Sequence, residues 1–366
     1  MNLLPNIRQL FTQMLNRGSK IQLDELEQLL KQHLGLLSLS DREQQQLTQW
    51  YNQVYHLHFL NPYLQQPELR EIMIQGESLI QLDCGKGLIN YPLDGIERED
   101  LILSMERLAQ QSGINWSFHS PFASFQITLQ QSTFRATMLH QAVTADRSPR
   151  LYLRHIESTL FTPQEFKVPH ELWQKICTWI KQKKNILISG ASGSGKSSFV
   201  RMLLKVVPPN EHLVILEDTV ELASMDKSRT NLIADGEQKS KSLSDLCGYA
   251  LRMRPDRIIV GELRGKEITP LLLALNTGHR GMLSTIHADS AADSIQRATL
   301  LFALHTADQK INHATITKLI CKNIDLVIHL KDCHITQVIN LIGSEGVTPY
   351  YQERYSVTSD QPNKNS

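Results

Sequence analysis

The sequence predicts an α/β protein in which a smaller α+β domain and a helical extension precede a domain with a mostly parallel sheet. The first observation is that short apolar strands alternate with helical stretches over residues 170–342. Such an alternation is typical of a parallel sheet covered on both faces. The second is that residues 59–160 mix short strands with one helix, an α+β pattern. The third is that residues 1–58 carry leucines at helical spacing.

The composition is that of an ordinary globular protein. The chain has 366 residues, of which 41% are hydrophobic and 20% charged, with a net charge of +1. These values exclude a disordered chain, a collagen-like chain and a small disulfide scaffold. The even charge gives no general attraction to nucleic acid or anionic lipid. Five scattered cysteines, none in a CxxC pair, indicate free thiols in a reducing compartment.

Targeting signals are missing from the chain. The first 15 residues lack the basic start and apolar run of a signal peptide. No apolar run approaches the ~20 residues that cross a bilayer. We therefore expect a cytoplasmic protein without a transmembrane segment, which could still dock on a membrane complex.

The first 160 residues divide into helices and then mixed elements. Ser40 and Glu43 form a capping-box pattern that predicts the start of a helix reaching Val54. Strands are expected at 69–74, 79–82, 125–129, 134–139 and 151–156, and a helix at 101–111 ended by Gly113. This pattern sets a helical extension over 1–58 and an α+β N-domain over 59–160.

A linker and a larger domain follow. Residues 161–169 contain two prolines and little periodicity, so we expect a linker there. In the domain over 170–342, strands are expected at 185–189, 213–216, 257–260, 282–286, 326–330 and 335–342. Residues 343–366, with a polar end from 358, are expected to form a C-terminal tail.

The strongest motif is a phosphate-binding loop that matches G-x-x-x-x-G-K-[ST] in full. An apolar strand precedes it and a helical stretch follows, as the motif requires. Glycines let the backbone N–H groups turn inward to cradle phosphate oxygens, and the helix N-terminus adds partial positive charge. A glycine/serine turn that binds nothing is disfavoured by this context. The predicted nucleotide-binding residues are Gly190, Ala191, Ser192, Gly193, Ser194, Gly195, Lys196, Ser197 and Ser198.

Three further strands end in polar groups. Glu217 and Asp218 follow the strand at 213–216, Glu262 follows the strand at 257–260, and His287 follows the strand at 282–286. Groups just beyond the carboxyl ends of parallel strands face the ligand crevice. A single acid after a strand is commonly only a solvated turn. The three positions together with the phosphate loop predict one catalytic rim.

At these positions the chain resembles the hexameric ATPases of type II and type IV secretion and of type IV pili, with the Tad/Flp-pilus and conjugation-type branches most similar. Segment 216–222 resembles the family's Asp box, 251–265 its Walker B segment and 274–290 its His box. Residues 60–76 resemble the opening of its N-domain. The resemblance covers about residues 55 to 342 and implies a RecA-like P-loop ATPase domain.

The resemblance also implies roles. Lys196 and Ser197 bind the phosphates of ATP, and Ser197 and Glu262 hold Mg²⁺. Glu217 polarises the attacking water, and His287 senses the γ-phosphate. For Arg252 and Arg254, contact with ligand or a subunit boundary stands beside structural ion pairing with Asp245 or Asp256. His279 is as compatible with packing as with a functional contact.

N-domain arginines complete the implied site. Arg135 aligns with the arginine of a glycine-arginine strand start, and Arg154 with the arginine ending the last N-domain strand. The alternative is a solvated basic surface, which is favoured more for Arg147 and Arg150. The chain departs from the family here: Ser124 and Gln126 replace the usual Asp and Arg, and the glycine before Arg135 is missing.

The expected assembly is a homo-hexameric ring with ATP between subunits, acting on inner-membrane platform proteins of a pilus or secretion system. Closure about the 161–169 linker would transmit ATP hydrolysis. Two alternatives remain. A RecA-like nucleic-acid motor lacks support because no basic, aromatic-rich stretch is present. A non-hydrolysing ATP-binding assembly protein is opposed by the intact Lys196, Glu217 and Glu262.

Overall fold

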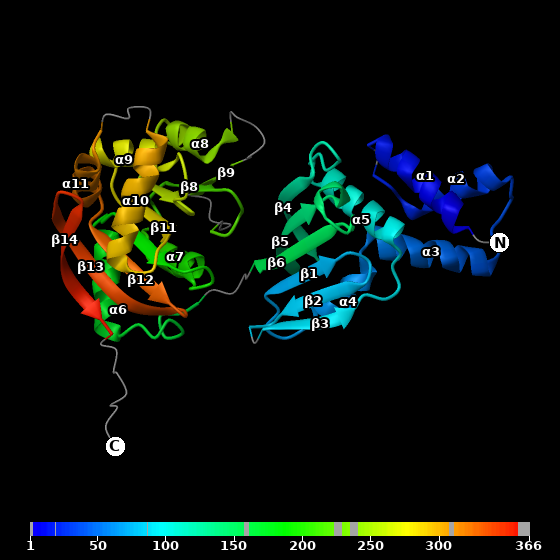
Figure 1. Cartoon of the computed structure of the whole chain (residues 1–366), viewed down its shortest axis with the longest axis horizontal. Helices are drawn as coiled ribbons and strands as arrows, with labels where there is room; N and C mark the ends of the chain where they lie inside the picture. The colour runs from blue at the N-terminus through cyan, green and yellow to red at the C-terminus, as the bar shows by residue number, and fades with distance from the viewer. Residues whose placement is uncertain are drawn as a thin grey trace, which may run out of the picture. The chain divides into compact units, whose positions relative to one another are not determined.

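The computed structural model describes residues 3–18, 20–85, 87–156, 161–222, 229–234, 241–306 and 311–357. The chain forms two compact units, Met1–Ser158 and Thr159–Ser366, each with its own cores (Figure 1). Each unit is therefore considered by itself.

The first unit begins with three helices that bury one apolar face each. They are α1 (Leu4–Asn16), α2 (Leu23–Leu34) and α3 (Asp41–Tyr55). The predicted capping box opens α3: the Ser40 amide donates to Glu43 Oε2 at 3.0 Å. The Ser40 hydroxyl donates to the same oxygen at 2.8 Å. The helices meet through a core that includes Phe11, Leu30 and Trp50.

The N-domain is a six-stranded antiparallel sheet with one long helix on its buried face. The strand order is β3-β2-β1-β6-β5-β4. Alternate residues point into a core shared with α5 (Arg98–Gln111), as expected for a sheet covered on one side. The other elements are η1 (His58–Leu60), α4 (Asn61–Leu64), β1 (Glu71–Gln75), β2 (Leu79–Asp83), β3 (Leu88–Pro92), β4 (Phe122–Leu129), β5 (Ser132–Leu139), η2 (Gln141–Val143) and β6 (Arg150–Ile156).

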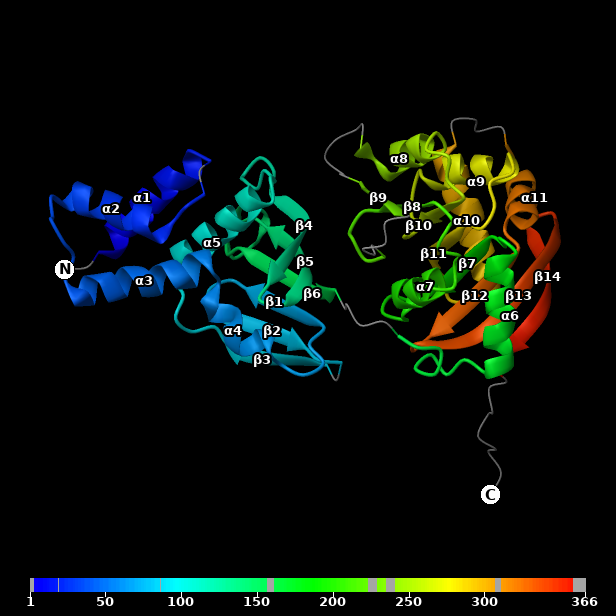
Figure 2. The same cartoon turned by 180° about the vertical axis from the view of Figure 1, so that it is seen from behind.

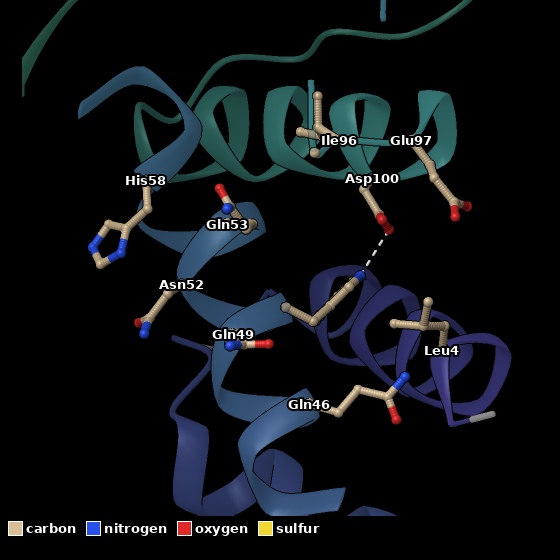
Figure 3. Close-up of a pocket in the computed structure, with 11 residues that line it drawn as sticks. Leu4, Gln46, Gln49, Asn52, Gln53, His58, Ile96, Glu97 and Asp100 are labelled. Atoms are coloured by element: carbon tan, nitrogen blue, oxygen red, sulfur yellow. Dashed lines mark hydrogen bonds between the residues drawn. The ribbon is translucent and has the colours of Figure 1, made fainter. Parts of the chain in front are cut away.

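Helix α5 joins the helical extension to the N-domain, and lies between them in Figure 1 and, seen from behind, in Figure 2. Its Asp100, only 7% exposed, accepts hydrogen bonds from the Arg8 Nε of α1 at 2.7 Å and from the Trp50 Nε1 of α3 at 2.8 Å, the latter drawn as the dashed line in Figure 3. Leu103 of α5 packs into the core of the extension. The extension is thus part of the first unit.

The second unit is built on an eight-stranded sheet in the order β14-β13-β12-β7-β11-β10-β8-β9. From β12 to β9 all neighbours run parallel, and β12, β13 and β14 pair antiparallel. The strands are β7 (Ile186–Gly190), β8 (Leu213–Glu217), β9 (Arg229–Ile233), β10 (Arg257–Val260), β11 (Leu283–His287), β12 (Leu326–Lys331), β13 (His334–Glu345) and β14 (Thr348–Ser356).

Helices cover both faces of this sheet, which is why its central strands β7, β8 and β10 are buried along their whole length. Helices α8 (Leu243–Ala250), α9 (Ile268–Asn276), α10 (Ala291–His305) and α11 (His313–Asn323) share one core with Leu187 and Val214. Helices α6 (His170–Lys181) and α7 (Lys196–Leu204) share the other with Ile186 and Ile215. Figure 1 shows α10 in front of the sheet, and Figure 2, from behind, shows α6 and α7.

Two expectations about the ends of this unit need correction. Residues 343–356 are not a tail: β13 continues to Glu345, and β14 pairs with it antiparallel. The remaining part of the expected tail, 358–366, lies outside the described residues.

The expected linker at 161–169 is also not an independent connector. Its Phe166 is 1% exposed and packs edge-on against Phe199 of α7, with ring centroids 5.1 Å apart. Phe161 packs on Phe166 in turn, at 5.6 Å. Hydrogen bonds from the Thr162 amide and hydroxyl to Glu165 close the turn. Residues 161–169 are therefore packed against the second unit as part of its core.

Candidate nucleotide-binding site

The four strands that carry predicted site residues lie side by side in the sheet. His287, the last residue of β11, lies directly opposite Gly190, the last residue of β7. On the other side of β11, Val260 of β10 is level with Leu216 of β8. Because the strands run parallel, Gly190, Glu217, Glu262 and His287 gather at one edge.

Two glycines of the phosphate loop combine a positive φ with close neighbours, which disfavours any other residue at either position. A Cβ on Gly190 would lie 2.3 Å from the backbone oxygen of Leu330, and its φ of +153° is in the left-handed region. A Cβ on Gly195, with φ +87°, would lie 3.1 Å from both Phe166 Cε1 and Cys333 Sγ. The loop is thus held between β12, the Cys333 turn and the 161–169 segment.

Lys196, the first residue of α7, points back into the loop. Its Nζ donates to the carbonyl oxygens of Gly190 at 3.0 Å and Ala191 at 2.7 Å. The same nitrogen lies 3.4 Å from His287 Nδ1. His287 Nε2 lies 2.8 Å from Glu262 Oε1. A polar chain therefore links the loop lysine, the histidine of β11 and the acid after β10.

Glu217 is the buried acid of the rim. It is 3% exposed, and its Oε1 accepts hydrogen bonds from the amides of Glu221 and Leu222, both at 2.8 Å. Within the described part of the chain, Oε2 is buried and has no hydrogen-bond partner. Burial raises the pKa of Glu217 from 4.5 to about 7, although the two amide hydrogen bonds act in the opposite direction. A carboxyl group of this pKa exchanges a proton readily near neutral pH.

Residues that the sequence did not single out support this rim. Arg264 forms an ion pair with Asp218, which leaves Glu217 as the buried acid of the predicted Glu-Asp pair. Glu267, 4% exposed, accepts from the amides of Arg264 at 2.6 Å and Gly265 at 2.7 Å and so fixes the loop after Glu262. No local signal in the sequence separates Glu267 from an ordinary surface acid.

A buried histidine of β12, His329, lies beside the phosphate loop. Its Nδ1 is 2.9 Å from the Ser189 hydroxyl, and the side chain is only 8% exposed. Burial lowers the pKa of His329. Its pattern in the sequence is only that of a residue within an apolar strand.

Arg252, Arg254 and His279 lie outside the rim residues described above, and the structure shows the contacts of each. Arg252 and Arg254 are exposed, and neither forms an ion pair among the described residues. Asp256 instead contacts Lys183 Nζ at 3.5 Å. His279 is half-buried, with its Nδ1 3.2 Å from the carbonyl oxygen of Ala274, near the end of α9. This contact caps the end of its own helix and leaves both alternatives for His279 open.

The two N-domain arginines lie on the first unit. Arg135 of β5 and Arg154 of β6 are directly opposite in the antiparallel ladder. Their neighbours in sequence, Phe134 and Leu153, point into the core, so both arginines lie on the opposite face of the sheet. Arg135 Nε donates a hydrogen bond to the Ser124 hydroxyl at 3.3 Å. In the register of the sheet, Arg154 lies level with Glu71 of the neighbouring strand β1.

The family of the chain follows from comparison with known proteins. The family model described as "Type II/IV secretion system protein" matches residues 123–355. The chain belongs to this family. The match includes all four strands of the rim and the arginine-bearing strands β5 and β6. The predicted membership is confirmed.

Individual relatives agree with this membership. The type IV secretion system protein VirB11 of Bartonella quintana is 33% identical over 182 residues, which are 49% of this chain and 50% of the relative. A putative conjugal transfer protein of Mycobacterium tuberculosis is 27% identical over 270 residues, 70% of this chain and 76% of the relative. The chain therefore spans about half the length of the first of these relatives and three quarters of the second.

The fold has solved counterparts. The pilus retraction motor PilT, crystallised with bound ADP, is similar with a TM-score of 0.57 at 17% identity, covering 83% of each chain. At that identity the likeness shows the fold alone, and it confirms the predicted α/β ATPase fold. Among the described helices, none is long and apolar enough to cross a bilayer.

Proposed function

We propose that the chain is a ring-forming, Mg²⁺-dependent ATPase that couples ATP hydrolysis to pilus assembly or to protein or DNA secretion. One observation carries the proposal: a complete phosphate loop stands beside a buried acid whose pKa is about 7 and whose second oxygen has no partner in the described chain. Family membership adds the cellular setting.

Phosphate binding falls to the loop and Lys196. The backbone turns at Gly190, Gly193 and Gly195, all with positive φ, so that amides can face an anion at the start of α7. The Lys196 ammonium, held by two loop carbonyls, is placed to exchange them for phosphate oxygens.

The residues present fit Mg²⁺. Ser197 offers a hydroxyl on the first turn of α7 and Glu262 a carboxylate that is 29% exposed. One or two protein oxygens with phosphates and waters are what this ion takes in phosphoryl-transfer sites. When bound, Mg²⁺ supplies neutralisation of charge on the phosphates.

Water activation is assigned to Glu217. Its Oε1 is fixed by two backbone amides, which leaves Oε2 to accept a hydrogen bond from water. A base with a pKa near the working pH combines a usable fraction of carboxylate with enough basicity to take the proton. His287, between Lys196 and Glu262, is suited to sense whether the γ-phosphate is present.

Arg135 and Arg154 are proposed to neutralise charge on the γ-phosphate. The two arginines lie directly opposite each other in the ladder, where an anion could contact both, although Glu71 lies level with Arg154 on its other side. The ring itself is proposed as a homo-hexamer at the cytoplasmic face of the inner membrane, with platform proteins as partners. The M. tuberculosis conjugal transfer relative and VirB11 support this setting by name alone.

The test compares Lys196→Ala with the control variant Lys205→Ala. Lys205 is an exposed lysine at the other end of the same helix. Lys196→Ala should abolish turnover of saturating Mg·ATP by the full chain, because the phosphates lose their cation. Lys205→Ala should retain it. Wild-type turnover by a folded Lys196→Ala protein would remove the assignment. Turnover that appears only with added DNA would favour the nucleic-acid motor, and binding without turnover would favour the assembly protein.

A further inference from the structure

Strand β12 and the turn after it lie against the phosphate loop. Leu330 of β12 is directly opposite Gly190, the first residue of the loop, and its carbonyl oxygen is 2.3 Å from the place of a Cβ there. In the turn, Cys333 Sγ is 3.1 Å from the corresponding place at Gly195. One strand and its turn therefore touch the loop at both of its ends.

A buried histidine joins β12 to the residue that precedes the loop. His329 is directly opposite Ser189 in the parallel register, and its Nδ1 is 2.9 Å from the Ser189 hydroxyl. Leu187 and Val327, two residues earlier on each strand, belong to the core under α8 to α11, so the two polar side chains face the same side. Ser189 has no exposed surface and His329 is 8% exposed. The hydrogen bond is thus made inside the domain, away from competing water.

The imidazole ring of His329 is uncharged at neutral pH. Burial lowers its pKa below the usual 6.5, and Lys196 and Lys331 act in the same direction. Asp289 and Asp293, before and within the first turn of α10, act against this shift without reversing it. A neutral ring has one N–H group and one lone pair, and a hydroxyl both donates and accepts, so either tautomer can make the bond to Ser189.

We infer that His329 is a positioning residue for nucleotide binding, which acts through Ser189 to hold the start of the phosphate loop in its phosphate-binding conformation. The carbonyl oxygen of the next residue, Gly190, accepts the hydrogen bond from Lys196 Nζ at 3.0 Å, so a displacement of this backbone would also displace the phosphate-binding lysine. A loop that is ordered before the nucleotide arrives loses less conformational freedom on binding.

The inference rests on the proposed function, because it concerns the same nucleotide site. The alternative is a histidine that only stabilises the core of the domain. That alternative predicts variants with lower stability and unchanged nucleotide affinity, so affinity decides between the two.

The experiment measures the affinity of the full chain for the fluorescent nucleotide mant-ADP in the presence of Mg²⁺. His329→Leu removes the ring nitrogens and should weaken binding about fivefold to tenfold, the effect of one lost buried hydrogen bond. Ser189→Ala should weaken binding to the same extent. His329→Asn can place an amide atom where Nδ1 stands and should stay within about twofold of the wild type. In turnover assays of His329→Leu, KM for ATP should rise while kcat changes less than about twofold, because a binding contact is lost.

A double variant tests whether the two residues act through one bond. Ser189→Ala with His329→Leu should bind no more weakly than either single variant, because each change already removes the same hydrogen bond. Additive losses, or unaltered affinity in both single variants, would overturn the inference. Should His329→Leu fail to fold, Ser189→Ala and His329→Asn decide: equal affinities in these two variants would overturn it as well.

Thr299→Val is the matched control for general destabilisation. It removes another buried side-chain hydrogen bond of the second unit, in which Thr299 of α10 and Thr317 of α11 have their hydroxyls 3.1 Å apart. This variant should keep wild-type nucleotide affinity, and a loss as large as that of Ser189→Ala would refute a specific role for the His329 bond. Absence of nucleotide binding by the wild-type chain would contradict the proposed function itself, which keeps the two failures distinguishable.

Discussion

Glu217→Gln should make the protein more stable at neutral and alkaline pH while it removes activity. The charged carboxylate is held in a site where burial raises its pKa from 4.5 to about 7. Between these two values the folded state binds a proton that the unfolded state releases. Stability therefore falls as pH rises through this window, and the loss is complete above pH 7. Each pKa unit corresponds to about 1.4 kcal/mol, so the free energy of unfolding falls by about 3 kcal/mol across this window.

The glutamine keeps the two amide hydrogen bonds at Oε1 and has no charge to bury. The variant should thus exceed the wild type by about 3 kcal/mol at pH 8 and by less than about 1 kcal/mol at pH 5. Because the chain has two units, the readout should be native-state hydrogen exchange of the buried β8 amides, corrected for the intrinsic rate at each pH.

Glu171→Gln is the matched control, since it changes an exposed glutamate on α6 of the same unit. Its effect should stay within a few tenths of a kcal/mol at both pH values. A stability difference for Glu217→Gln that is equal at pH 5 and pH 8 would refute the reasoning, because it would mean that the carboxylate carries no buried charge. In turnover assays the same variant should slow the chemical step by ~10²–10⁴ while nucleotide still binds.

Three other changes test the site. Gly190→Ala should abolish nucleotide binding, measured by equilibrium dialysis, because its Cβ would lie 2.3 Å from the Leu330 oxygen; normal affinity would contradict the loop geometry. Phe166→Ala should destabilise the second unit by about 3–5 kcal/mol in urea unfolding, since a buried ring is lost against α7; a change below about 1 kcal/mol would show that 161–169 is only a connector. Arg135→Ala and Arg154→Ala should each lower kcat at saturating Mg·ATP with unchanged stability, and unaltered kcat in both would leave them as a solvated basic surface.

The central strands could be predicted from sequence because burial on both faces makes them continuous apolar runs. Residues 213–216 are such a run, and β8 spans Leu213–Glu217. The edge strands could not be predicted in this way. β9 and β14 have half-exposed or exposed residues along most of their length, so their sequences do not differ from those of loops. β14 forms only because β13 extends beside it.

The same limit applies to the site. The phosphate loop is a local motif whose strand, turn and helix are contiguous in the sequence. By contrast, Phe166 touches Gly195 across nearly 30 residues, and its two flanking prolines favoured a free linker. The sequence alone also did not distinguish the roles of the two neighbouring acids Glu217 and Asp218. They differ because Arg264, in the loop after β10, forms an ion pair with Asp218 and not with Glu217. Contacts between distant segments decided each of these cases.

The two charged groups proposed to meet the nucleotide already have protein partners. Lys196 is bound by the carbonyls of Gly190 and Ala191, and Glu262 by His287. Nucleotide binding must exchange these contacts for phosphate and metal contacts, so part of the binding energy is spent on the exchange. His287 contacts both groups, at 3.4 Å from Lys196 and 2.8 Å from Glu262. Because one side chain contacts both groups, we propose that the move of Lys196 onto a phosphate also changes the surroundings of Glu262, the acid proposed for Mg²⁺.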